Sequence, residues 1–74
     1  MNLKEKRTRL SVLFGIEIDN RQTELIDSLL QDINMYHEAL DSIDTNDEVD
    51  NAAVVEYIVG SDNGLREQLR FIIN

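Results

Sequence analysis

The chain has 74 residues, a net charge of −8 and a sequence pI near 4.3, and it contains no cysteine, no proline and only three glycines. This length suits one domain spanning residues 1–74, and the scarcity of helix breakers favours an all-α fold. The lack of cysteine excludes disulfides and thiol chemistry, and no apolar run is long enough to span a membrane, so we expect a cytoplasmic protein with no membrane partner.

Residues 2–14 are expected to form the first helix. Asn2 with Glu5 three residues later resembles a capping box, and Gly15 is a typical helix stop. This segment contains four of the seven basic residues of the chain, Lys4, Lys6, Arg7 and Arg9. A period-2 alternation of apolar residues over 11–18 leaves a strand open as an alternative, and such a strand would have to pair between chains.

Residues 20–44 contain the most regular apolar pattern of the chain. Asp19 or Asn20 is expected to cap this segment, with Gln22 or Thr23 three residues on. The spacing of its apolar residues alternates between three and four, as in a heptad repeat. It predicts one continuous central helix of about 37 Å. The predicted seam, serving as the core or as an oligomer interface, consists of Ile26, Leu29, Ile33, Tyr36, Leu40 and Ile43.

Two further helices are expected after residue 44. Thr45 and Glu48 form a capping box that would start a third helix running to about Val59, with an apolar face made by Val49, Ala52, Ala53 and Tyr57 and with Ile58 as a further candidate. Its β-branched run, Val54, Val55, Ile58 and Val59, weakens helix propensity and would need burial to support it. Gly60 would end that helix, and a last one would run from about 63 to 73. The predicted fold is a small all-α bundle of three to four helices around one long central helix. Its first helix would bring basic side chains near Asp27 and Asp32.

No catalytic or metal-binding motif emerges. His37, Asp41 and Asp44 share a helical face and could hold a divalent ion, but a solvated face explains them better. A calcium loop starting at Asp44 would place Val49 where glycine is needed and Val55 where a bidentate glutamate is needed. We therefore expect no enzyme, no catalytic residue, no metal site and no cofactor.

The most distinctive surface feature is a series of acidic residues after the middle of the chain: Glu38, Asp41, Asp44, Asp47, Glu48 and Asp50. Asp41 and Asp44 would oppose the dipole at the end of the central helix, which makes them candidates for a partner site. An ordinary solvated helix end explains the same residues and stays open. Both tyrosines are expected in the core.

These features predict a non-enzymatic interaction module, a small regulator or inhibitor that occludes a basic, nucleic-acid-binding type surface of a partner protein. One alternative is a homo-oligomer, with a dimer as the first expectation, formed through the central heptad because so small a core gives a marginal free energy of folding. A second is a nucleic-acid-binding accessory protein that uses the basic segment 4–9. The acidic balance disfavours nucleic acid, because phosphates would be repelled.

Overall fold

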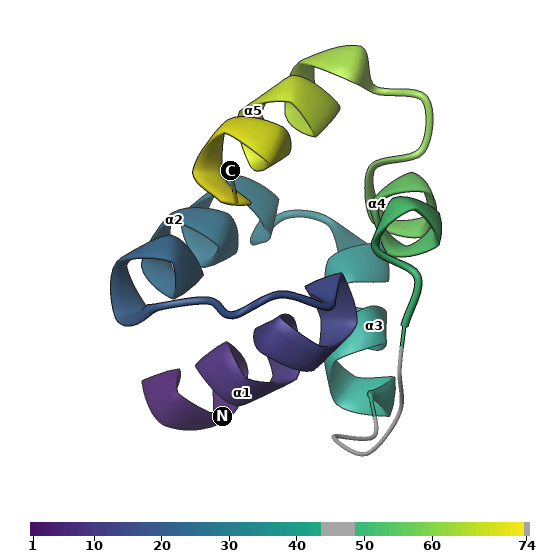
Figure 1. The fold of residues 1–74 in the computed structure, drawn as a ribbon. Helices are drawn as coiled ribbons and strands as arrows, with labels where there is room; N and C mark the ends of the chain where they lie inside the picture. The colour runs from purple at the N-terminus through teal and green to yellow at the C-terminus, as the bar shows by residue number, and fades with distance from the viewer. Residues whose placement is uncertain (44–48, 74) are drawn as a thin grey trace.

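The structure is a computed structural model that describes residues 1–43 and 49–73, and all regular structure in those residues is helical. In chain order the helices are α1 (Leu3–Phe14), α2 (Asn20–Leu30), α3 (Asn34–Ser42), α4 (Asn51–Val59) and α5 (Asn63–Ile73) (Figure 1). The predicted all-α class is confirmed. Within the described ranges there is no strand, and residues 16–18 connect α1 to α2 without pairing.

Both ends of α1 and the start of α2 lie where local chemistry predicts. The Asn2 side chain accepts a hydrogen bond from the Glu5 backbone N–H at 2.8 Å. Gly15 then ends α1 with a left-handed φ of 68°, which glycine adopts without a steric penalty. Asp19 and Gln22 form a reciprocal capping box that starts α2.

The predicted continuous helix over 20–44 is wrong, because the chain turns at residues 31–33. Ile33 has an extended backbone, with φ −98° and ψ 112°, and precedes the first residue of α3. The longest dimension of the molecule is 28 Å, whereas an unbroken helix over residues 20–44 would measure about 37 Å. Breaking the helix lets both halves lie within one compact core, which a straight rod would have left partly exposed.

The last two helices are each capped by an aspartate that precedes their first residue. The third helix was predicted to start at Thr45, but α4 begins at Asn51, where the Asp50 carboxylate accepts hydrogen bonds from the N–H groups of Ala52 and Ala53 at 2.9 and 3.3 Å. The Thr45–Glu48 capping box lies outside the described residues. The predicted stop at Gly60 and the predicted α5 are both present, and Asp62 caps α5 through the Leu65 N–H at 3.1 Å.

The helices pack around α1 rather than around a central rod. Helix α1 lies against α2, α3 and α4, and α5 covers α2 and α4 (Figure 1). The predicted arrangement of three to four helices around one long helix is therefore not what the structure shows. Helix α3 also packs against α4.

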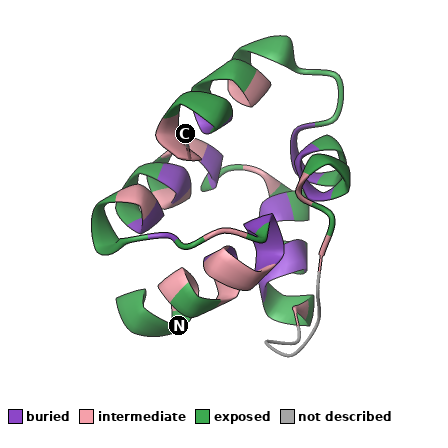
Figure 2. Cartoon of the chain, viewed as in Figure 1, coloured by how far each residue is buried: buried purple, intermediate pink, exposed green. Residues whose placement is uncertain are grey.

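The core draws side chains from all of these helices (Figure 2). Of the six predicted seam residues, Ile26, Tyr36 and Leu40 are buried, and the remaining three pack against the core while partly exposed: Leu29, Ile33 and Ile43. The accessible surface is 4829 Å², close to the roughly 4,600 Å² typical of a monomer of this mass. The seam residues thus have apolar neighbours within a single chain.

Candidate interaction surface

The exposed side of α3 combines acidic and apolar groups. Glu38 and Asp41 lie three residues apart on this helix and are both exposed. Met35, one turn before Glu38, is 46% exposed. From α4, the Tyr57 hydroxyl donates a hydrogen bond to Glu38 Oε2 at 3.2 Å, which brings an aromatic ring beside the carboxylate. We call Met35, Glu38, Asp41 and Tyr57 the α3 acidic face.

An apolar depression, here called the α3–α4 hollow, adjoins this face. It has a volume of about 290 Å³ and is bounded by α1, α3 and α4, with lining residues Leu13, Ala39, Ser42, Ile43, Ala53, Val54 and Tyr57. Ser42 lies four residues after Glu38, so both point to the same side of α3. The hollow and the α3 acidic face are therefore parts of one surface.

The six predicted partner-binding acids have different positions in the structure. Glu38 and Asp41 are exposed on α3, as an interaction surface requires. Asp50 is also exposed, but its carboxylate caps α4, so it has a structural role that the sequence interpretation did not include. The other three lie outside the described residues: Asp44, Asp47 and Glu48.

Tyr57 was predicted to lie in the core and is instead 52% exposed. The predicted apolar face of this helix is only partly correct: Ala52 and Ala53 are exposed as well, whereas Val49 packs against the core and Ile58 is buried. The buried face consists of the β-branched residues Val54, Val55, Ile58 and Val59. Four large aliphatic side chains bury more apolar area than two alanines and a tyrosine with a polar hydroxyl, which is the physical reason for the different orientation.

The basic residues of α1 are largely engaged within the molecule. Lys6 Nζ lies 3.0 Å from Asp27 Oδ2, as the predicted proximity to Asp27 requires. Arg7 donates to the Asn20 side chain at 2.9 Å, and Arg9 donates to the Leu40 carbonyl at 2.9 Å. Arg9 thereby places a positive charge at the carboxyl end of α3, where it is favourable.

Asp27 is also the acceptor for a buried tyrosine. The Tyr36 hydroxyl donates to Asp27 Oδ1 at 3.1 Å, and the Tyr36 side chain is fully buried. Burial and the neighbouring Asp27 charge raise the pKa of Tyr36 well above its ordinary value. Lys6, Asp27 and Tyr36 therefore form one polar contact among α1, α2 and α3.

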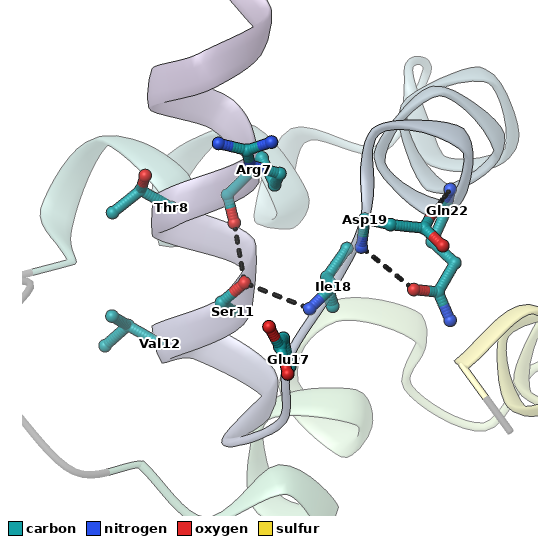
Figure 3. A pocket seen from close by; sticks show the side chains of 8 residues that line it. All are labelled: Arg7, Thr8, Ser11, Val12, Glu17, Ile18, Asp19 and Gln22. Carbon is teal, nitrogen blue, oxygen red and sulfur yellow. Dashed lines mark hydrogen bonds between the residues drawn. The ribbon is translucent and has the colours of Figure 1, made fainter.

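A broader groove lies between α1 and the segment leading into α2 (Figure 3). The Ser11 hydroxyl donates to the Arg7 carbonyl at 2.9 Å and accepts from the Ile18 N–H at 3.2 Å. On the opposite wall, the Asp19 N–H donates to Gln22 Oε1 at 3.0 Å. These polar groups satisfy one another, and the Ser11 hydroxyl is engaged with backbone groups on both sides of the groove. The hydrogen bond between Ile18 and Ser11 holds the extended connection against α1.

His37 closes the turn between α2 and α3. Its Nε2 donates to the Gln31 carbonyl at 2.7 Å, and its ring packs edge-on against Tyr36 with centroids 5.2 Å apart. Among the described residues, no three His, Asp or Glu side chains are grouped as metal ligands would be. Asp44, the third member of the motif considered from the sequence, lies outside those residues.

Comparisons with protein-family models, with curated proteins and with solved structures find no match to this chain. Across residues 1–43 and 49–73, none of the helices combines the length and apolar character needed to cross a membrane.

Proposed function

We propose that this protein is a non-enzymatic, acidic interaction module that binds a basic surface of a partner protein and acts as a small regulator or inhibitor by occluding it. The principal support is the α3 acidic face. Within the described residues, no lysine or arginine forms an ion pair with Glu38 or Asp41, whereas Asp27 and Glu56 are both paired. Glu38 and Asp41 are therefore available to an external cation.

The location of Asp41 adds to this argument. It lies in the last turn of α3, where a negative charge opposes the helix dipole. Such a residue contributes unfavourably to the free energy of folding, which is compatible with a role in binding rather than in stability. A net charge of −8 would also accelerate encounter with a basic partner, and Met35 and Tyr57 would slow its dissociation.

The proposed partner surface is of the kind that binds nucleic acid, because such surfaces present clustered Lys and Arg. The alternative in which this protein itself binds nucleic acid through α1 has less support. Three of its four basic side chains there already donate to groups within the chain.

Charge reversal tests the proposed function. A partner is first isolated from the native host by crosslinking and purified, and its dissociation constant is then measured for the parent chain and for Glu38→Lys/Asp41→Lys. We expect the double variant to bind at least tenfold more weakly and the parent complex to weaken as salt rises. It should unfold at the same or a higher urea concentration, since a repulsive charge at the end of α3 has been replaced by a favourable one.

The matched control is Glu24→Lys/Asp32→Lys, which changes the net charge equally on exposed positions outside the α3 acidic face. It should retain most of the affinity. Equal losses in both double variants would mean that only total charge matters, and unchanged binding in both would refute the proposed site.

Self-association is a second candidate, because α5 and α2 expose large apolar side chains. Phe71 is 88% exposed and Leu25 is 44% exposed, while the heptad seam is packed within the chain. Sedimentation over a range of concentrations for the parent chain and Phe71→Glu tests it. A dimer that dissociates on this substitution would support self-association through α5 and not through the heptad.

A further inference from the structure

We infer that the α3–α4 hollow binds one aliphatic side chain of the partner, located in a segment with Lys or Arg next to it. This inference rests on the proposed function, since it assumes a basic protein partner and specifies how that partner is recognised. It adds an apolar contact to the binding surface, beside the acidic residues Glu38 and Asp41.

The composition of the hollow favours an apolar guest. Leu13, Ala39 and Val54 are buried residues that line it, and Ile43 packs against the core beside them. Two of the wall residues, Ala39 and Ala53, have the smallest side chains compatible with a chiral residue, which leaves the depression open. An aliphatic group placed there would cover apolar surface that is now in contact with water.

The size of the hollow favours a side chain over a small-molecule substrate. Its volume of about 290 Å³ lies at the lower limit of ligand pockets, which range over about 300–1,000 Å³. A cavity of about 150 Å³ is enough to bind benzene. A single leucine or isoleucine side chain is small enough to enter this depression.

Carboxylates lie beside two residues that line the hollow. Glu38 of α3 accepts a hydrogen bond from Tyr57, a lining residue. The Asp50 carboxylate, which caps α4, accepts a hydrogen bond at 3.3 Å from the backbone N–H of Ala53, another lining residue. Arg9 of α1 donates to the Leu40 carbonyl. The charge pattern complements a segment with a basic residue next to the apolar one, and it would repel an acidic segment.

Two synthetic peptides test this inference directly. Both are blocked at their termini and alternate Lys with Ala, and they differ only at the central position, which is Leu in one and Ala in the other. Each is titrated into the isotope-labelled full chain at low salt, with binding followed by amide chemical shifts. We expect the Leu peptide to bind at least fivefold more tightly, with its additional shifts at Ala39, Ser42 and Ala53.

A pair of alanine variants supplies the control. Ala53→Leu fills the hollow and should abolish the preference for the Leu peptide. Ala52→Leu adds the same atoms at the neighbouring exposed position of α4, which borders a different depression beside Arg66, and should preserve the preference. If Ala53→Leu fails to fold, the comparison of the two peptides on the parent chain still decides the matter.

The outcomes separate this inference from the proposed function. Equal binding of the two peptides, with shifts confined to residues around Glu38 and Asp41, would overturn the inference and leave the charge-based function standing. Extra shifts for the Leu peptide near Leu25 or Phe71 would also overturn it. Absence of binding by both peptides at low salt would count against the proposed function as well.

Discussion

At the scale of single residues, Asp27 contacts two side chains from two other helices at once. One of its oxygens accepts from the Tyr36 hydroxyl at 3.1 Å, and the other lies 3.0 Å from Lys6 Nζ. Because a buried hydroxyl without a partner is costly, the tyrosine depends on this carboxylate. The contact connects three helices through a residue that the sequence pattern marked only as a polar position near the basic segment.

Removing the Tyr36 hydroxyl should lower stability. We expect Tyr36→Phe to reduce the free energy of unfolding by about 1–2 kcal/mol, because the hydrogen bond to Asp27 is lost while the ring still fills its site. Urea denaturation measures the change. Tyr57→Phe is the matched control, since its hydrogen bond to Glu38 is exposed, and it should cause no measurable change. Equal effects of the two substitutions would contradict the structural role of Asp27.

The same hydroxyl should make stability depend on alkaline pH. Burial and Asp27 raise the pKa of Tyr36 in the folded state, whereas an unfolded tyrosine ionises near pH 10. Above that pH the folded chain retains a proton that the unfolded chain has lost, so stability falls as the pH rises. Urea midpoints between pH 9 and 11 should therefore decline more steeply for the parent than for Tyr36→Phe. Parallel declines would show that Tyr36 does not contribute.

At the scale of helices, the turn at residues 31–33 shows what the sequence pattern could and could not predict. The apolar spacing correctly identified helical residues on both sides of the turn. It could not reveal the break, because the alternating spacing of three and four residues continues without interruption from α2 into α3. Asp32, Ile33 and Asn34 all have modest helix propensity, which is a weak signal for a break. The decisive factor is the size of the core, a property of the whole fold.

Two glycines provide a matched test of the helix boundaries. Gly15 has a φ of +68° after α1, so Gly15→Ala should destabilise the protein by about 1 kcal/mol. Gly64 is the second residue of α5, and a Cβ there would meet its nearest atom, Asp62 Oδ1, at an ordinary 3.4 Å. Gly64→Ala should therefore stabilise the protein by about 0.5–1 kcal/mol, because alanine has fewer conformations than glycine in the unfolded chain. Thermal unfolding distinguishes the two, and shifts in the same direction would refute the assigned ends of α1 and α5.

At the scale of the whole molecule, the core should be complete within one chain. Ile26 is fully buried and its neighbour Leu25 is 44% exposed. We expect Ile26→Ala to cost about 2–5 kcal/mol and Leu25→Ala to cost far less. The urea midpoint of the parent should not vary with protein concentration. A midpoint that rises with concentration would instead show that association contributes to folding.

The candidate site was only partly predictable from the sequence. The exposed acids Glu38 and Asp41 were identified by their charge and helical position. The α3–α4 hollow was not, because it depends on how α1, α3 and α4 meet, and no local pattern encodes that meeting. Tyr57 was assigned to the wrong face, because the four aliphatic residues around it take the buried side of α4 instead.

The starts of the helices differ in whether a side chain caps them. Asn2, Asp19, Asp50 and Asp62 each supply a side-chain acceptor to the helix that follows, but α3 begins after Ile33 with no such bond. The helix that presents Glu38 and Asp41 is thus the one least able to form by itself, and it depends on the assembled neighbours. Amide hydrogens in α3 should exchange with solvent sooner than those of α2. Binding of the proposed basic partner to the α3 acidic face should slow the exchange of the α3 amides selectively.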